Sequence, residues 1–596
     1  MTAARRLRIS LEVFRLMFSL DLRRAVLALT PIVAGATLAS YLSARALLRA
    51  ARAGDDAGVA VAVGVFAVAF LLTAWIGRAA RTARLQLGEA TLLALQLRRA
   101  HAVLRPRHTT DLEHRRNADR VALLESRSFE VSQAPRMFGW MVDSLGGLLV
   151  SVGLLLTVDP WLVLVALGGL PATLLNGREQ ATLQRARTAE MERTRRAQLV
   201  YDLATHPSHA DEVRVAGLED ELFDRYSTDW RHADRAQHRA ELRAGGIAAL
   251  GWFAQLAAFA IAVIVLIRGV RNGSVPPENL FLALGAMGLI VGQVGQAVSG
   301  VTSLGQITAI FGELEDLESS LPTPPTSFEG RPLQPAPRTL QHGIQLRDVS
   351  FRYDGATTDA LSDVTIELPA GSVVAIVGDN GAGKSTFVKM LFGLYAPTSG
   401  AVLIDGVDLR ALDHHDWQQR TSSCFQDHLH LQLLARESIG AGDLNHVDDA
   451  EHVHMAADRA LATQLLERLP DGLETRLGLR LKGTDLSGGE WQRVAIARAM
   501  MRRNLLLLAL DEPSAALDPL AEREIFNQYR THSRDLVAAN GTITVLVTHR
   551  FSTVGLADLI VVLDHGRVAE IGTHTDLVAA RGTYADMYEL QARHFR

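Results

Sequence analysis

Long apolar stretches in the N-terminal half constrain the fold of this chain more than any other feature of its sequence. Six stretches carry at most one charged side chain each: residues 25–44, 57–77, 137–158, 160–177, 244–267 and 279–312. A helix needs roughly 20 apolar residues to cross the hydrocarbon core of a membrane. The number and spacing of the stretches disfavour the alternative, which is a set of buried helices in a soluble protein. We therefore predict an all-α transmembrane domain over residues 1–318 with six spans.

Two longer segments, residues 78–136 and 178–243, separate the second span from the third and the fourth span from the fifth. Both segments are rich in arginine, and positively charged loops tend to stay in the cytoplasm. We therefore expect both long segments, and the C-terminal half of the chain, on the cytoplasmic side of the membrane.

Polar residues within the predicted spans raise separate questions. Asp143 is the single carboxylate in the third span, and a charge inside a membrane indicates a functional site by default. Because Asp143 stands near a span end, a position at the membrane–water interface is favoured. Gln293 and Gln296 give the sixth span a polar stripe, which either lines a pathway or joins helices by hydrogen bonds. The sequence leaves these two alternatives open.

Residues 319–340 hold six prolines, which predicts a linker. Residues 341–596 then alternate short β-rich runs, such as "SVVAIVG" at 372–378, with helical runs. This alternation predicts an α/β domain with a largely parallel sheet. The net charge of −4 gives no attraction to nucleic acid. The one cysteine, Cys424, excludes a disulfide framework within the chain.

The segment "GDNGAGKST", residues 378–386, matches the phosphate-binding loop G-x-x-x-x-G-K-[ST] in the context that the loop requires, after a strand and at the start of a helix. Its glycines allow the backbone N–H groups to surround phosphates. Lys384 is predicted to neutralise the β- and γ-phosphates, and Ser385 to offer its hydroxyl to Mg²⁺. The predicted nucleotide-binding residues here are Gly378, Asp379, Asn380, Gly381, Ala382, Gly383, Lys384, Ser385 and Thr386.

Two further strands end in residues that suit nucleotide chemistry. The run "LLLLALDEP", residues 505–513, predicts a strand covered on both faces, with Asp511 at its end to hold Mg²⁺. Glu512 follows as a candidate base that polarises an attacking water. The run "ITVLVTH" ends at His549, which we predict to reach a γ-phosphate.

The segment "LSGGE", residues 486–490, places two glycines at a helix start, where exposed N–H groups suit an anion. With the phosphate loop and the apolar spans, this motif makes the whole chain resemble an ATP-binding cassette (ABC) exporter of the six-span half-transporter type. The resemblance implies a RecA-like core with a helical subdomain, a bacterial cytoplasmic (inner) membrane location, and ATP with Mg²⁺ as ligands. It also implies that Ser487, Gly488 and Gly489 close over the γ-phosphate of ATP held by a second chain.

The resemblance assigns further roles. Tyr353 matches the aromatic residue that stacks on adenine. Gln426 matches a glutamine that reaches Mg²⁺, and His549 matches the switch histidine. Asp518 in "SAALD" matches the acid by which one cassette senses the other's site. Residues 211–220 resemble the coupling helix that contacts a cassette. Two features depart from the family. Glu490 stands where the family most often has glutamine, and "RLKGTD" before the signature replaces a segment that is usually acidic and rich in glycine.

The resemblance implies ATP-driven export by a homodimer, or by a pair with a homologous half-transporter. The apolar spans favour an amphipathic cargo: a lipid, a hydrophobic small molecule or a peptide. Import of a small molecule such as a siderophore, lipid flipping, and an ATP-gated channel remain alternatives. The histidine pairs indicate solvated side chains rather than a metal site, because no third ligand stands at a suitable spacing; they are His414/His415, His428/His430 and His452/His454.

Overall fold

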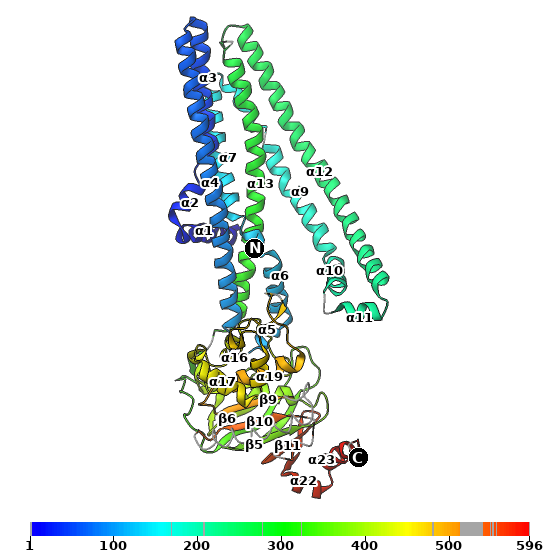
Figure 1. The fold of residues 1–596 in the computed structure, drawn as a ribbon. Helices are drawn as coiled ribbons and strands as arrows, with labels where there is room; N and C mark the ends of the chain where they lie inside the picture. Colours follow the sequence, from blue (N-terminus) through cyan, green and yellow to red (C-terminus); the bar gives the residue numbers. More distant parts are fainter. Residues whose placement is uncertain are drawn as a thin grey trace. The chain divides into compact units, whose positions relative to one another are not determined.

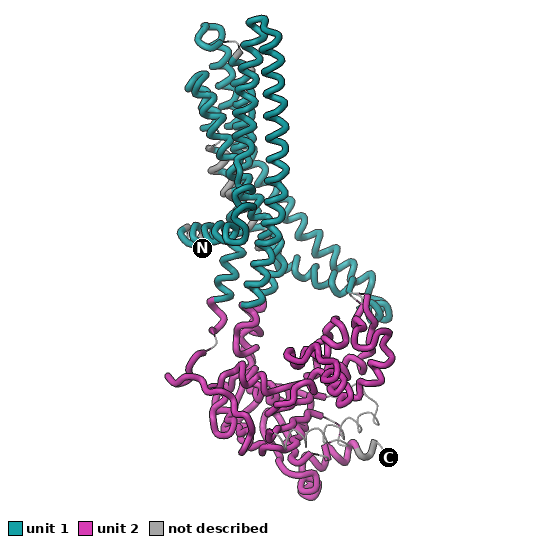
Figure 2. Tube along the Cα trace, turned by 60° about the vertical axis from the view of Figure 1, so that its left-hand side comes forward, with its two compact units in different colours: residues 1–101, 120–318 teal, residues 102–119, 319–596 magenta. Residues whose placement is uncertain are grey.

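The computed structural model describes residues 3–168, 170–206, 209–276, 278–323, 325–479, 482–512, 540–548, 550, 554–555 and 557–594. The chain divides into two compact units (Figures 1 and 2). Unit 1 comprises residues 1–101 and 120–318, and unit 2 comprises residues 102–119 and 319–596. Unit 2 therefore takes in a short piece of the first long segment between the predicted spans.

Unit 1 is entirely helical over its described residues. Its elements, some of which continue past the unit boundary, are α1 (Ala3–Leu20), α2 (Leu22–Ala28), α3 (Ile32–Ala53), α4 (Asp56–Leu104), α6 (Arg115–Val131), α7 (Ala134–Leu156), the 3₁₀ turn η1 (Pro160–Val163), α8 (Leu164–Leu167), α9 (Leu170–Ala189), α10 (Met191–Thr205), α11 (Ala210–Val215), α12 (Glu219–Arg271) and α13 (Glu278–Ser320). With 53 residues, α12 extends about 80 Å, well beyond the thickness of a bilayer. Its N-terminal half is accordingly polar.

Three of the described helices are long and apolar enough to cross a membrane, namely α4, α7 and α12. A fourth crossing follows if α2 and α3, bent by 46° at their junction, count as one span. The fourth predicted span is divided between η1, α8 and α9, and its residue 169 lies outside the described residues. The sixth predicted span lies within α13, whose apolar stretch is Leu282–Ala297. The number of six spans stays a prediction.

The bend between α2 and α3 is held by Asp143 of α7. Pro31 precedes α3, and the first backbone N–H groups of a helix have no partner within it. Asp143 accepts a hydrogen bond from the Ile32 N–H at 2.7 Å and pairs with the Arg84 guanidinium at 2.8 Å. Arg84 also donates to the Ala28 carbonyl. Asp143 and Arg84 are each 5% exposed, so the carboxylate is buried among helices, while its expected depth at the membrane–water interface stays a prediction.

The two glutamines of α13 differ in their surroundings. Gln296 accepts a hydrogen bond from Ser144 of α7 at 3.2 Å, so it joins two helices. Gln293 is 4% exposed, and neither its amide nitrogen nor its amide oxygen has a hydrogen-bond partner among the described residues. The structure therefore supports helix joining for Gln296 and leaves the role of Gln293 open.

Unit 2 contains two larger sheets and a short hairpin. The strands are β1 (Ser327–Phe328), β2 (Arg331–Pro332), β3 (Gly343–Phe351), β4 (Leu361–Pro369), β5 (Val373–Val377), β6 (Ser399–Ile404), β7 (Val407–Asp408), β8 (Thr421–Cys424), β9 (Leu507–Asp511), β10 (Ile543–Val547), β11 (Leu559–Asp564) and β12 (Arg567–Gly572). The six-stranded sheet has the order β12-β11-β5-β10-β9-β8, and every pairing except β11 with β12 is parallel. The four-stranded sheet β4-β3-β6-β7 is antiparallel. The predicted α/β class is confirmed.

Helices cover the parallel sheet, and three apolar cores result among the described residues. The helices are α5 (Thr110–Glu113), α14 (Lys384–Leu391), α15 (His414–Gln419), α16 (Ala435–Gly440), α17 (Ala450–Arg459), α18 (Thr463–Arg468), α19 (Gly488–Ala499), α22 (His574–Ala580) and α23 (Thr583–His594). One core packs α14 between the two sheets, a second packs α16 to α19 against β8 and β9, and a third packs α22 and α23 against β5 and β11. Because β9 and β10 are parallel neighbours, their carboxyl ends lie at one edge of the sheet.

Candidate functional site

The phosphate-binding loop joins β5 to α14 and needs glycine at two positions. Gly378 and Gly383 have φ angles of 152° and 98°, and a side chain at either would collide with a backbone carbonyl, that of Leu563 or Ala360. Lys384 begins α14, and its ammonium group donates to the Gly378 carbonyl at 2.8 Å. The backbone N–H groups at the start of α14 suit an anion, as the motif predicts.

Asp511 at the end of β9 lies beside the second residue of α14. The Ser385 hydroxyl donates to the Asp511 carboxylate at 3.1 Å. Burial raises the pKa of Asp511, the Ser385 hydrogen bond opposes that rise, and the nearby Glu512 adds to it. A buried carboxylate that disfavours its charged form gains from a bound cation. The hydroxyl of Ser385 and this carboxylate are neighbouring oxygen donors, which Mg²⁺ prefers, while the amide oxygen of Gln426 as a further ligand stays a prediction.

Glu512 is held in a strained conformation directly after β9. Its φ angle is 49°, in the left-handed region that costs a non-glycine residue about 1–3 kcal/mol and is often found at functional sites. Its N–H donates to the Val547 carbonyl of β10 at 2.9 Å, and its own carbonyl accepts from Gln492 of α19 at 3.0 Å. Its carboxylate accepts a hydrogen bond from the Gln426 amide at 3.2 Å. The structure thus brings Glu512 and Gln426 together.

Tyr353 lies next to the helix that follows the phosphate loop. Its hydroxyl is 2.8 Å from the hydroxyl of Thr386, and its ring meets those of Phe351 and Tyr395 edge to face. Tyr353 is 37% exposed, so one side of it remains open to a ligand. Adenine stacking stays a prediction for this residue.

The signature turn is organised by Glu490. Ser487 is the N-cap of α19, and the Glu490 carboxylate accepts hydrogen bonds from both the N–H and the hydroxyl of Ser487, each at 2.9 Å. Arg468 of α18 pairs with the other carboxylate oxygen of Glu490 at 2.7 Å. Burial alone would raise the pKa of Glu490, but the hydrogen bonds from Ser487 and Arg468 outweigh it and lower the pKa. Among the described residues, no hydrogen bond links Ser487 to the phosphate loop of its own chain.

Two predicted site residues fall outside the part of the chain that the structure describes. They are His549, the predicted switch histidine, and Asp518 of the "SAALD" segment. Their roles stay predictions. Residues 210–215 form the short helix α11 in unit 1, inside the segment that resembles a coupling helix, and most of its side chains are exposed.

Sequence reasoning missed two side chains that support the predicted site. Gln492 holds the backbone of Glu512, and Arg468 neutralises Glu490. The "LSGGE" motif indicated Gln492 only in part: this residue lies one helical turn after the two glycines and so on the same face of α19. Arg468 gave none, since it is one of many surface arginines.

A third missed feature is the segment 102–119, which packs into unit 2. The Arg107 guanidinium donates to the carbonyls of Leu409 at 2.6 Å and Arg410 at 3.1 Å. The Thr109 N–H donates to the Leu394 carbonyl at 2.9 Å, and the Tyr395 hydroxyl contacts Glu113 at 3.1 Å. A piece of the first long segment is therefore anchored to the strand and loop region that follows α14.

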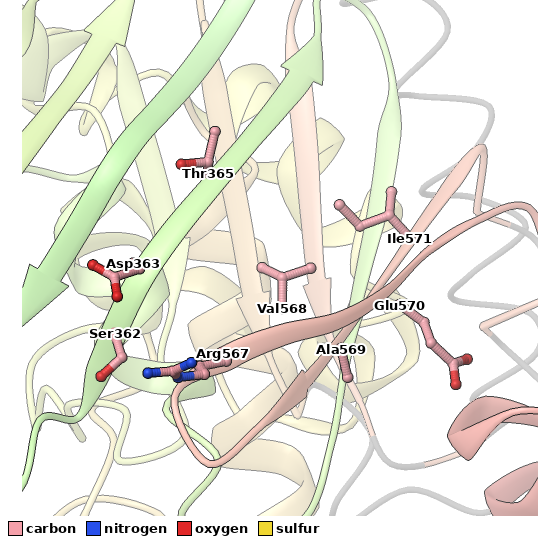
Figure 3. A pocket seen from close by; sticks show the side chains of 8 residues that line it. All are labelled: Ser362, Asp363, Thr365, Arg567, Val568, Ala569, Glu570 and Ile571. Atoms are coloured by element: carbon pink, nitrogen blue, oxygen red, sulfur yellow. The ribbon is translucent and has the colours of Figure 1, made fainter.

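An open groove of about 450 Å³ between the edge strands β4 and β12 is a different site (Figure 3). Its lining includes Asp363 of β4 and Arg567 and Glu570 of β12. It contains none of the predicted nucleotide-binding residues. The candidate nucleotide site is therefore at the edge of the parallel sheet where β5 and β9 end and α14 begins.

Comparison with known proteins supports this reading of the site. Residues 361–515 match the family model described as ABC transporter. The chain is 35% identical over 331 residues to an ATP-dependent lipid A-core flippase of Methylococcus capsulatus, covering 56% of this chain and 52% of the relative. It is 36% identical over 249 residues to a subtilin transport ATP-binding protein of Bacillus subtilis, covering 42% of this chain and 39% of the relative. The chain thus spans about half or less of the length of these relatives.

The fold of the whole chain also has a solved counterpart. A bacterial Atm1-family ABC exporter with ATP bound superimposes with a TM-score of 0.74 at 24% identity, covering 96% of this chain and 98% of that one. The predicted order of a helical membrane domain followed by an α/β cassette is confirmed by this likeness. Three of the chain's described helices are long and apolar enough to cross a membrane, in keeping with the predicted multi-pass location in the inner membrane. Residues 361–515 thus match the ABC transporter family, on a chain with the fold of that ABC exporter.

Proposed function

We propose that the chain is one half of an ATP-driven exporter, and that two copies hold two ATP molecules between their cassettes. The observation that carries the proposal is the hydrogen-bonded set around the phosphate loop, with Ser385 on Asp511 and Gln426 on Glu512. This set stands in a chain whose other unit has helices long and apolar enough to cross a membrane. Hydrolysis of ATP at the cassette can therefore drive movement of the helices of unit 1.

The residues of the site suit hydrolysis of a terminal phosphate. Lys384 and the N–H groups that begin α14 bind and orient the phosphates. Glu512, strained and aimed at Gln426, accepts a proton from the attacking water or orients it. Ser385, Gln426 and Asp511 would hold Mg²⁺, which neutralises charge on the β- and γ-phosphates when bound. His549 is proposed to contact the γ-phosphate.

The signature turn is proposed to act on the nucleotide of the other chain. Glu490 fixes the N–H and hydroxyl of Ser487, so the glycine N–H groups at the start of α19 stay ordered for an anion. ATP that contacts both cassettes binds the closed state more tightly than the open one. Shifting the population from 1:99 to 99:1 takes about 5.5 kcal/mol of differential binding, shared here by two ATP molecules.

Movement of the cassettes is proposed to reach the membrane helices through two contacts. The first is the segment 102–119, anchored on its own cassette by Arg107 and Thr109. The second is a groove of about 280 Å³ on the cassette, lined by Phe425, Arg498 and Arg502 among others. Because Phe425 precedes Gln426, a helix seated in that groove would sense the nucleotide site. The helix α11 of the partner chain is the proposed occupant.

An amphipathic cargo is favoured for the exporter. Similar proteins include a lipid A-core flippase, a β-(1→2)glucan export protein and a subtilin transport protein, so the chemistry of the cargo differs among them. The buried, unpartnered amide of Gln293 favours lipid flipping as the second candidate, since a polar headgroup would satisfy it.

The proposal is tested with the full chain in lipid nanodiscs. Glu512→Gln should retain ATP and lose steady-state hydrolysis, while Lys384→Ala should lose binding as well. The matched control is Glu474→Gln, an exposed glutamate of the same unit outside the site. Export is measured as ATP-dependent flux of labelled lipid, peptide or dye in proteoliposomes. Wild-type hydrolysis rates in Glu512→Gln would refute the catalytic assignment.

A further inference from the structure

We propose that the cassette carries a transition-metal site of the Zn²⁺ type, formed by Asp443, His446 and His452. The three residues lie on the helical side of the cassette, in the loop after α16 and at the start of α17. One ligand atom from each lies within 4.8 Å of the other two. The proposal is independent of the proposed export function.

This group could not be recognised from the sequence, because its members are not the pairs that stand out by spacing. His452 is two residues from His454, but His454 is exposed whereas His452 is buried. The fold instead brings His446 beside His452, with the ring centroids 4.6 Å apart and the ring planes at 16°, so the exposed His446 ring must rotate for both imidazoles to face one ion. Asp443 supplies the third donor, which the histidine pair lacked.

His452 is oriented for coordination by the backbone. Its side chain is buried, and its Nε2 lies 2.7 Å from the Met501 carbonyl oxygen. A carbonyl only accepts, so Nε2 carries the proton and Nδ1 of the neutral ring presents a lone pair. Metal-bound histidines show this arrangement, in which a backbone carbonyl fixes the tautomer.

The two carboxylate oxygens of Asp443 have different roles: one caps a helical turn, and the other is available to a metal ion. Oδ1 accepts the Asn445 N–H at 3.2 Å and caps the short helical turn that carries His446. Oδ2 lies 2.9 Å from Nδ1 of His446. A metal ion would replace that hydrogen bond: the neutral His446 ring moves its proton from Nδ1 to Nε2, and Nδ1 coordinates. No net proton is released.

The donor set selects the kind of ion. Two imidazole nitrogens and one carboxylate suit Zn²⁺, Co²⁺ or Ni²⁺ better than Mg²⁺ or Ca²⁺, which prefer oxygen donors. Three protein ligands leave a fourth position for water in a tetrahedral site. The nearby Arg502, which donates to the Gly442 carbonyl at 2.9 Å, adds a positive charge that opposes any cation, so the ion must be held by its bonds to nitrogen rather than by net charge.

A bound ion would connect two parts of the cassette. His452 belongs to α17, and Met501 follows the signature helix α19. Asp443 and His446 belong to the loop between α16 and α17. The ion would therefore hold this loop and α17 against the end of α19, and its binding should raise the thermal stability of the cassette.

The test uses the full, untagged chain in nanodiscs, stripped with chelator and free of nucleotide and Mg²⁺. Co²⁺ is titrated and followed by its visible absorption, and Zn²⁺ is measured by competition with a zinc indicator. We expect one ion per chain. His446→Ala removes an exposed ligand, and Asp443→Asn keeps a good N-cap while removing the charged oxygen. Each should weaken binding at least about tenfold.

The matched control is His454→Ala, which removes a histidine of the same helix outside the group. It should bind Co²⁺ as the wild type does, and the melting temperature should rise with Zn²⁺ in both. Equal affinity in His446→Ala and wild type would overturn the proposal. So would equal losses in His446→Ala and His454→Ala, or no stoichiometric Co²⁺ absorption in the wild type.

Discussion

Removing the carboxylate of Glu490 tests how the signature turn is organised. In Glu490→Ala, the N–H and hydroxyl of Ser487 each lose a bond at 2.9 Å to a charged acceptor. Hydrogen bonds to charged groups contribute about 1.5–3 kcal/mol, but water replaces part of this at a turn near the surface. The exposed pair with Arg468 adds about 0–1 kcal/mol. The net loss should resemble that of a helix cap, about 1–2 kcal/mol.

That loss should be visible in the affinity for ATP. If an ordered turn is needed to close on nucleotide, about 1–2 kcal/mol corresponds to a roughly 5- to 30-fold rise in the KM for ATP. The assay is steady-state hydrolysis by the full chain in nanodiscs across a range of ATP concentrations. Glu490→Gln keeps an acceptor for the Ser487 N–H and should show a smaller rise.

Arg468→Ala is the matched control, because it leaves both bonds to Ser487 in place and removes only the exposed ion pair. Its KM should change less than about fivefold, since the exposed pair contributes at most about 1 kcal/mol. A folded Glu490→Ala variant with the KM of the wild type would refute the reasoning, because Ser487 would then need no support from Glu490.

Three further predictions follow from buried contacts. Asp143→Asn leaves the Arg84 charge buried without its counter-ion and should cost about 3–5 kcal/mol, seen as a lower melting temperature in nanodiscs; an unchanged melting temperature would contradict the buried pair. Burial lowers the pKa of His414 from 6.5 to about 4, so between pH 6.5 and pH 4 this histidine is protonated in the unfolded chain but not in the folded one. Cassette stability should therefore fall as the pH drops from 6.5 toward 4, and His414→Gln should flatten this melting profile; equal slopes would be contrary. Gln492→Met removes the bond to the Glu512 carbonyl and should lower kcat while ATP binding persists, whereas a normal kcat would show that this bond is dispensable.

Much of the fold was predictable because the signals are local. The apolar stretches follow from the chemistry of the bilayer, and the phosphate loop sits between a strand and a helix as its motif requires. Ser385 and Asp511 are far apart in sequence, yet their meeting follows from parallel strands that end at one edge of a sheet. Their catalytic roles remain predictions, although the geometry supports them.

Contacts between distant polar segments were not predictable. Arg84 stands in an arginine-rich run, so nothing marked it as the partner of Asp143. The anchoring of residues 102–119 rests on arginine and backbone contacts that have no periodic pattern. His446 and His452 meet because a turn and a helix start fold back on each other. Such contacts depend on loop geometry, which single residue types do not specify.

The central claim is that each ATP lies between the phosphate loop of one chain and the signature turn of the other. Dimers of two differently tagged chains, all carrying Glu512→Gln to retain ATP, test it by counting bound ATP. With Lys384→Ala on one chain and Ser487→Arg on the other, both changes fall in one shared site, and one ATP should remain. With both changes on one chain, both shared sites are damaged, and no ATP should remain. The reverse result would place each complete site within a single chain and contradict the account.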